Sequence, residues 1–477
     1  MKIFSSLLIL IFSIIYSESF AIDNIKKDKK TIINSIESQK DRLIEISDNI
    51  WEAAEPALLE FKSSKYLSDY AEENGFRVTR GVAEIPTAFV AEFGSGKPVI
   101  GILGEFDANP GISQKKQPTK EPLVKGAAGH GCGHNLYGTG SLGAAIAIKE
   151  MIESGEISGT VRFYGTPAEE TIFAKVWMVR AGLFDDVDVC MDWHPSDEVE
   201  AATQSSKALV DFRLRFFGDA SHASGDPWNG NSAVDAMELY TTGLNYYREH
   251  VRPTARIHYD IEKAGDVVNV VPDFAQIWTR LRENDKENVN ILYERAKKIA
   301  EAASMMANVD YEMELISGIY EIMPNRFGAG IIQENIEYLG EIQYTEDEIN
   351  YANTILKETG KELKGIDSKI RPIRPTLPAQ GGSTDVGDVS QVVPVVRMRA
   401  TAAAKDGPWH SWAVVACTGM SIGHKGMIYA SKALAMTMLD LYKNPKLIDG
   451  VKKEFITRKG DRVYVPQIPP GPPKLID

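Results

Sequence analysis

The sequence predicts an α/β fold that is interrupted by a smaller α+β domain. One observation is the continuous apolar run at residues 98–103, which is typical of a strand buried on both faces of a sheet. A second is that acidic side chains and histidines follow this run and later strand-like runs, where open α/β sheets place their sites. The third is a change of pattern from about residue 205 to residue 324, where several strands follow one another.

The first 21 residues have the pattern of a signal peptide. Lys2 gives a short basic start, Ile3 to Ile15 is mostly apolar, and small residues stand at Ser19 and Ala21. The apolar run is too short for an ordinary membrane span. We therefore expect the mature chain to be exported, to the periplasm or outside the cell, and to be free of the membrane. An uncleaved anchor is the alternative.

The composition is that of a globular chain long enough for two domains. Of the 477 residues, 43% are hydrophobic and 25% are charged. The net charge of −13 argues against a nucleic-acid partner, because such a partner needs a concentrated basic surface. The three cysteines are too few for a disulfide framework in an exported protein. Two of them, Cys190 and Cys417, lie in apolar runs and are expected in the core.

The first part of the larger domain is predicted at residues 22–204. It begins with helical periodicity from about residue 29 to residue 70. Strands are predicted at 88–93 and 98–103, and the second ends in the acidic segment 104–107. This segment lies where α/β sheets place their sites, although ordinary loop carboxylates are the alternative.

A glycine-rich loop at residues 128–143 brings His130, Cys132 and His134 together. Thiolate and imidazole bind borderline transition metals, and the glycines let the backbone bend around an ion. The alternative is a plain turn with one buried cysteine and two surface histidines. The loop also contains a formal G-x-G-x-x-G, but no apolar strand runs directly into it, so we do not interpret it as a dinucleotide site. Its glycines are expected to let a helix at 138–150 pack closely.

Two further predicted strands are followed by candidate site residues. Glu169 and Glu170 follow the strand at 161–165, and His194 follows the strand at 187–191. Adjacent carboxylates on an extended backbone point in opposite directions, so one can bind a metal while the other faces a water molecule. This pattern favours metal-assisted hydrolysis, whereas a lone Glu-Glu pair would be an ordinary solvated loop.

The inserted domain is predicted at residues 205–324, in the order strand, helix, three strands, helix. The expected strands are 208–216, 256–260, 266–271 and 275–282, and the expected helices are 232–248 and 289–307.

The chain then returns to the larger domain at residues 325–477. A charged, helical and peripheral excursion is expected at 334–359. A second glycine-rich polar loop follows at 380–388, and His410 is the last candidate site residue before a helix predicted at 421–439. The proline-rich tail is expected to be extended.

Taken together, these segments resemble the zinc-exopeptidase-like aminoacylase and carboxypeptidase family. The closer resemblance is to the amidohydrolases related to aminobenzoyl-glutamate utilisation proteins. The matching segments are GEFDANPG, GHGCGHNLYGTG, GTPAEE, DWHP, SHAS, VVNVVPD, GGSTDVGD, PWHSW and GHKGM. They cover nearly the whole mature chain in the family's order, and as a set they are highly specific.

The resemblance implies a catalytic domain with two adjacent divalent metals and a ferredoxin-like lid that also forms a dimer. Mn or Zn would suit a mixed set of sulfur, nitrogen and oxygen ligands. It implies that Glu169 is the general base. His222 and Asn269 of the insert match positions that reach into a neighbouring subunit's site and hold the substrate or its oxyanion. Five residues match metal ligands of the family: Cys132, His134, Glu170, His194 and His410.

The chain departs from the family's pattern at two positions. Glu105 stands where many relatives have a ligand histidine in a His-x-Asp segment, and the Cys-x-His pair is expected to take over that role. Asp107 is then expected to support a ligand rather than bind metal itself. Asn135 stands where amidohydrolase relatives often have Asp, which leaves the identity and occupancy of the metals open.

The function that the resemblance implies is metal-dependent hydrolysis of an amide bond next to a free carboxylate. Aminobenzoyl-glutamate, other N-acyl amino acids and dipeptides are the candidate substrates. A homodimer is expected, with a complex between homologous chains as the alternative. Two other classes of function stay open, an exported non-catalytic metal- or peptide-binding protein and an amidase that uses Cys132 as its nucleophile.

Overall fold

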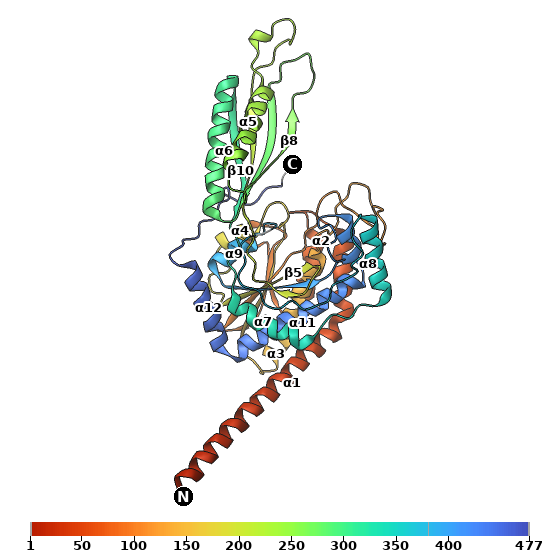
Figure 1. The fold of residues 1–477 in the computed structure, drawn as a ribbon, viewed down its shortest axis with the longest axis vertical. Helices are drawn as coiled ribbons and strands as arrows, with labels where there is room; N and C mark the ends of the chain where they lie inside the picture. The colour runs from red at the N-terminus through yellow and green to blue at the C-terminus, as the bar shows by residue number, and fades with distance from the viewer. Residues whose placement is uncertain (1, 380, 476–477) are drawn as a thin grey trace.

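The computed structural model describes residues 2–379 and 381–475, with side chains described from residue 25 onward. The chain forms a larger body and a narrower lid that projects from it, and helix α1 extends from the opposite end of the body (Figure 1). The side chains of the predicted signal peptide, residues 1–21, lie outside the described residues. In the part of the chain that is described, no helix is both long enough and apolar enough to span a bilayer.

The body is built on a mixed sheet of seven strands among the described residues, in the order β1-β2-β4-β3-β5-β11-β6. Strands β4, β3, β5 and β11 run parallel to one another, and helices α3 and α11 pack on them while α1 covers both helices. The body strands are β1 (Arg77–Arg80), β2 (Phe89–Ser95), β3 (Val99–Gly104), β4 (Gly159–Gly165), β5 (Val189–Ser196), β6 (Glu200–Ala201) and β11 (Val395–Thr401). The body helices are α1 (Lys2–Ala53), α2 (Phe61–Glu73), α3 (His134–Glu153), α4 (Lys175–Arg180), α7 (Arg326–Leu339), α8 (Glu346–Glu358), α9 (Val386–Val392), α10 (Trp412–Thr418), α11 (Ser421–Lys443) and α12 (Pro445–Lys459).

The lid is a second folding unit with its own core. Its sheet has the order β10-β7-β9-β8 and is antiparallel, and α5 and α6 pack against β7 and β9. A cluster of buried apolar side chains fills the space between these helices and the sheet, separate from the core of the body. The lid elements are β7 (Ala208–Phe217), α5 (Ala233–Tyr247), β8 (Arg256–Ala264), β9 (Phe274–Glu283), α6 (Lys286–Ala307) and β10 (Asp310–Ile319).

The α/β body with an inserted α+β domain confirms the predicted fold class, but the predicted order of the insert is wrong. The observed order is βαββαβ, the ferredoxin-like arrangement. Residues 266–271 form a loop that contributes only a bridge from Val270 to His222, and Gly265 turns the chain there with a φ of 68°. The prediction also missed the edge strand β10, although residues 310–315 alternate between polar and apolar side chains, as an antiparallel strand with one face toward solvent does.

Several boundaries in the body also differ from the prediction. The helical stretch at 29–70 is two helices, because α1 ends before Pro56, which disfavours helix in the residue that precedes it. The excursion at 334–359 is likewise two helices, and α7 is not peripheral but packs on β11 and α11. Helix α3 begins four residues early, at His134, and β5 continues through His194 because it stays paired with β11 as far as Ser196.

The base of the lid is joined to the body by two chain crossings and by the C-terminal tail. The backbone N–H of Gly318, near the end of β10, donates to the Gln467 carbonyl of the tail at 2.7 Å. The Gly471 carbonyl then accepts hydrogen bonds from Trp177 and Arg180 of α4. The proline-rich tail therefore links the lid to the helix that follows the Glu169–Glu170 turn.

Candidate metal centre

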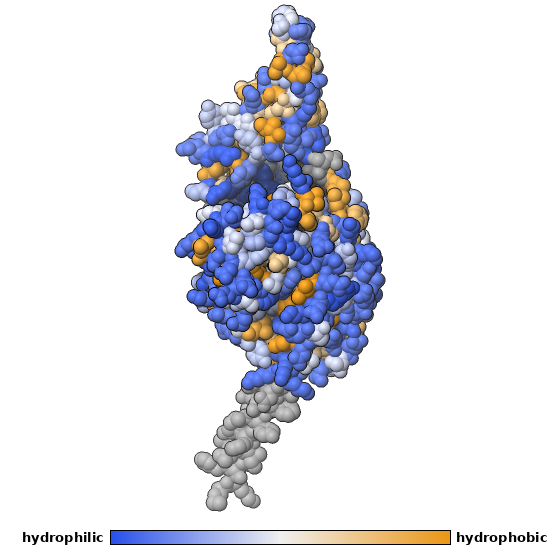
Figure 2. Space-filling view, turned by 90° about the vertical axis from the view of Figure 1, so that its right-hand side faces the viewer, coloured by the Kyte–Doolittle hydropathy of each residue, from blue (hydrophilic) through white to orange (hydrophobic). Residues whose placement is uncertain are grey.

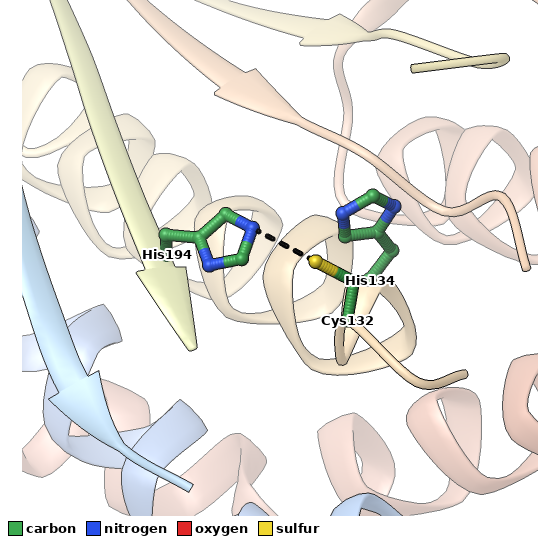
Figure 3. A group of neighbouring side chains, drawn as sticks. All are labelled: Cys132, His134 and His194. Carbon is green, nitrogen blue, oxygen red and sulfur yellow. Dashed lines mark hydrogen bonds between the residues drawn. The ribbon is translucent and has the colours of Figure 1, made fainter. Parts of the chain in front are cut away.

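Side chains from several separate segments meet near the carboxyl ends of β3, β4 and β5. Cys132 and His134 stand at the start of α3, and His194 comes from β5 (Figure 3). The Cys132 Sγ lies 3.4 Å from His194 Nε2, and the two rings of His134 and His194 are 5.7 Å apart, edge to face. Gly133 allows this loop to enter the helix with a φ of 75°. Gly138 lets α3 approach β3, because a Cβ there would lie 2.6 Å from the Glu105 carbonyl oxygen.

The two ring nitrogens of His134 have different surroundings. Its Nδ1 lies 2.9 Å from Asp107 Oδ1, and the whole side chain is buried. Its Nε2 faces Glu105 Oε2 at 3.0 Å and Glu170 Oε1 at 3.8 Å. A carboxylate on Nδ1 fixes the ring and its tautomer, which leaves Nε2 as the atom able to bind metal. Asp107 therefore lies where the sequence predicts a supporting residue.

The turn that carries Glu169 and Glu170 is fastened at its start and middle by buried carboxylates. Glu60 Oε1 accepts a hydrogen bond from the Ala168 backbone N–H at 2.9 Å, where Ala168 has a φ of 57°. Asp107 Oδ2 accepts one from the Glu170 N–H, also at 2.9 Å. The turn is thereby held so that Glu170 faces the histidines.

His410 reaches the same place from the loop before α10. Its Nε2 lies 3.7 Å from Glu170 Oε2, and its side chain is 59% exposed. The backbone N–H of His410 donates to the Gly131 carbonyl at 3.1 Å, which ties this loop to the Cys132 loop. The five residues predicted as ligands are thus close together, whereas His130 is turned away and bonds the Ile50 carbonyl.

The residues present fit a divalent metal centre. Of the buried side-chain atoms among the described residues that have no hydrogen-bond partner, three meet at this site: Glu105 Oε2, His134 Nε2 and Glu170 Oε1. In each of two groups that share one thiol, the donor atoms lie within 4.8 Å of one another: Cys132, His134 and His194, and Cys132, Glu170 and His410. A further group of this kind joins Glu105, His134 and Glu169. A mixed set of sulfur, nitrogen and oxygen donors suits Zn or Mn.

The electrostatics separate the roles of the candidate residues. Burial, together with the charge of Glu105 and Glu170, raises the pKa of Glu169 well above its usual value. Burial lowers the pKa of His194 well below its usual value, which keeps the ring neutral as a metal ligand must be. Burial and then the nearby Glu170 raise the pKa of the Cys132 thiol. Such a thiol is a poor nucleophile on its own, which disfavours the Cys132 amidase.

These residues open into a cavity of about 370 Å³ between the body and the base of the lid. Four arginines line it, and three of them are paired: Arg280 with Asp211, Arg397 with Asp192, and Arg399 with Glu200. The fourth, Arg282 on β9, has a buried Nε without a partner, and no carboxylate of the described residues pairs with it. An unpaired guanidinium in such a cavity is suited to a carboxylate of a bound molecule.

His222 and Asn269 lie elsewhere, in the outer loops of the lid. Both are exposed, and the Ala223 N–H donates to the Asn269 carbonyl at 3.0 Å, so the two segments lie against each other. Neither residue lines the cavity of its own chain. Within one chain, the structure therefore assembles the metal centre without these two residues.

Sequence reasoning missed Arg282, Lys175 and Asp385. Arg282 lies in a strand that was predicted correctly. The sequence alone does not show which arginine of that strand lacks an acidic partner. Asp385 lies in the polar loop at 380–388, and Lys175 lies in a short helix that was not predicted. Their importance depends on contacts between segments that are far apart in the sequence.

The fold and the metal-binding geometry define a hydrolase of amide or peptide bonds. The profile of peptidase family M20/M25/M40 matches residues 101–411, and the chain belongs to this family. It is 36% identical to one of the subunits of the p-aminobenzoyl-glutamate hydrolase of Escherichia coli (strain K12), over 89% of this chain and 94% of that protein. It is 29% identical to the Xaa-Arg dipeptidase of Mus musculus, over 90% and 92% of the two chains.

Solved structures share the fold. An aminobenzoyl-glutamate utilization protein from Klebsiella pneumoniae superposes with a TM-score of 0.60 at 17% identity, over 86% of this chain and 98% of that one. A dinuclear metal binding peptidase of the M20 family from Bacillus subtilis superposes with a TM-score of 0.58 at 18% identity, over 85% and 99%.

Proposed function

We propose that this protein is an exported, metal-dependent amidohydrolase that cleaves the amide bond of N-acyl amino acids, with N-(4-aminobenzoyl)-glutamate as the leading candidate substrate. The observation that carries the proposal is the cluster of unsatisfied buried donor atoms at Glu105, His134 and Glu170, beside a buried Glu169 and an unpaired Arg282. The relatives support the choice of acyl group and amino acid, because one of them is named as part of a p-aminobenzoyl-glutamate hydrolase.

The proposed metal content is two divalent ions, Mn or Zn. Cys132, His134 and His194 would hold one, and Glu170 and His410 would hold the other together with Cys132. Metals bound there would lower the pKa of the attacking water and polarise the substrate carbonyl. The support is the two donor groups and their mixed chemistry.

Glu169 is the proposed general base. Its carboxylate takes a proton from the water that attacks the amide carbon and then delivers that proton to the nitrogen of the leaving amine. Its burial beside the cavity excludes competing water, and it has no hydrogen bond or ion pair with any other described side chain that would hold it away from the substrate. The carboxylate oxygens of Glu170, the next residue, instead face the Nε2 atoms of His134 and His410.

Arg282 is the proposed anchor for the free carboxylate next to the scissile bond. Its guanidinium can form two parallel hydrogen bonds to a carboxylate, which fixes the orientation of a small substrate. This assignment explains why the cavity contains an arginine without an acidic partner. It predicts that the enzyme distinguishes a free carboxylate from a neutral amide at that position.

The test compares N-(4-aminobenzoyl)-glutamate with its α-amide, in wild type and in Arg282→Met. We expect the wild type to prefer the free acid, and Arg282→Met to lose about 10- to 100-fold in kcat/KM on the acid, because a charged hydrogen-bonded pair contributes about 1.5–3 kcal/mol. The variant should change little on the amide. Arg295→Met, at an exposed arginine of α6, is the matched control. Equal use of acid and amide by the wild type would contradict the assignment.

The proposed assembly is a homodimer in which His222 and Asn269 serve the site of the second copy, where His222 stabilises the oxyanion. The support is that both residues are exposed and absent from their own cavity. Apolar residues also show on the lid surface (Figure 2), and Trp228 and Val268, close in sequence to these two residues, are 77% and 100% exposed. A homologous chain is the alternative partner, because two relatives from Escherichia coli are named as different subunits of one hydrolase.

A further inference from the structure

A buried lysine lies beneath the metal centre and is not part of the function proposed above. Lys175, the first residue of α4, is fully buried in its side chain. Its Nζ lies 2.6 Å from Glu105 Oε1 and 2.7 Å from Asp385 Oδ1. Its backbone N–H donates to the other oxygen of Asp385 at 2.8 Å. Every polar group of the lysine therefore faces one of two buried carboxylates or belongs to the helix.

The two oxygens of Glu105 have different surroundings. One is held by Lys175, and the other lies 3.0 Å from His134 Nε2 without a hydrogen bond. Because the first oxygen is fixed, the plane and direction of the carboxylate are fixed as well. Glu105 is thus kept beside the one nitrogen of His134 that is free to bind metal.

The local charge shows why the lysine is needed there. Four carboxylates, those of Glu105, Asp107, Glu169 and Asp385, are almost completely buried around it. Among the described residues, no other lysine or arginine forms an ion pair with any of the four. Buried carboxylates without a partner are strongly disfavoured, so the ammonium group determines where two of them can stand.

Lys175 also stands at the end of the turn that carries Glu169, the proposed base, and Glu170, a proposed ligand. Four residues separate it from Glu170, and Phe173 between them has a φ of 65°. The turn is fastened at Ala168 by Glu60, at the Glu170 N–H by Asp107, and at its far end by Asp385 through Lys175. The lysine therefore fixes both Glu105 and the end of the Glu169–Glu170 turn.

We propose that Lys175 is a positioning residue of the metal centre. It acts through Glu105, which it holds beside His134 Nε2 in the arrangement that binds metal. The proposal rests on the metal centre of the proposed function, but not on its substrate. Residues that orient metal ligands in this way typically contribute about 10- to 100-fold to metal affinity. The effect to measure is therefore metal affinity, by competition with a chromophoric chelator for Zn²⁺ or Mn²⁺, independently of hydrolysis.

Two variants test the path through Glu105. Glu105→Gln keeps the Lys175–Asp385 pair and should fold, but it should bind metal about 10- to 100-fold more weakly. Lys175→Met should bind metal more weakly by a similar factor and should also lower the thermal midpoint of the metal-free protein, because two carboxylates lose their partner. Lys207→Met, which removes a buried lysine of the lid that bonds Thr254 and Asn284, is the control and should keep wild-type metal affinity.

The double variant Lys175→Met/Glu105→Gln separates positioning from charge balance. It has the same net charge in the cluster as wild type, and only Asp385 has lost its partner, so the stability of the metal-free protein should recover in part, whereas the metal affinity should stay low. Recovery of both would show that Lys175 only balances charge, and wild-type affinity in Glu105→Gln would contradict the path through Glu105. Failure of the wild type to bind either metal would contradict the proposed function instead.

Discussion

Glu169→Gln is expected to abolish hydrolysis while the metal content stays near that of the wild type. The amide keeps the shape of the side chain but cannot take a proton from the attacking water. General bases contribute about 10²–10⁴ in rate, so kcat should fall by at least this range while KM changes little. The geometry separates Glu169 from the two groups that share Cys132, since Glu170 is the neighbour of His134 and His410.

The measurement combines steady-state hydrolysis of N-(4-aminobenzoyl)-glutamate with metal analysis of the same sample. Glu170→Gln should lose metal as well as activity, and Glu346→Gln, at an exposed position in the first turn of α8, should change neither. If Glu169→Gln loses its metal and Glu170→Gln keeps it, the two glutamates have exchanged roles.

Mixing two inactive proteins, Glu169→Gln and His222→Ala, is expected to restore activity. In a dimer with shared sites, the His222→Ala chain keeps its own Glu169 and receives an intact His222 from the other chain. Random exchange makes half of the dimers mixed, each with one complete site, so about a quarter of the wild-type activity should return. The reason is the position of His222, which is exposed in the lid and absent from its own cavity.

The control mixes Glu169→Gln with Glu170→Gln. Both changes lie in the same half of the site, so no pairing of these chains contains an intact site, and activity should not return. Subunit exchange is checked by mass spectrometry with differently labelled chains. A fully active monomer, or no recovery after proven exchange, would exclude the shared site.

Part of the site could be predicted from the sequence because Glu170 follows strand β4 and His194 lies near the end of β5. The candidate donors are of residue types that commonly bind metal: Cys132, His134, Glu170, His194 and His410. The parallel strands of the sheet have their carboxyl ends at one edge, where such a site is expected. This arrangement brings Glu170 and His194 together, whereas Cys132 and His134 reach the site from the start of α3 and His410 from the loop before α10. Two errors in the body were local: helix α1 ends before Pro56, which the proline itself could have indicated, and α3 begins four residues earlier than predicted.

The contacts that hold the site could not be predicted in the same way. Lys175 pairs with Glu105 and Asp385, which are 70 and 210 positions away in the chain. Arg282 is distinguished by the absence of an acidic partner, and no pattern in β9 shows that. Each of these features arises only when distant segments fold against one another.

The central claim is that hydrolysis depends on metal held by this site. The most direct measurement is the hydrolysis of N-(4-aminobenzoyl)-glutamate by the purified protein before chelation, after complete removal of metal, and after return of Zn²⁺ or Mn²⁺, with metal counted per chain at each step. We expect activity with about two metals per chain, loss of activity when they are removed, and recovery when they return. Undiminished hydrolysis in the metal-free protein would contradict the claim, as would metal binding without hydrolysis of any N-acyl amino acid or dipeptide.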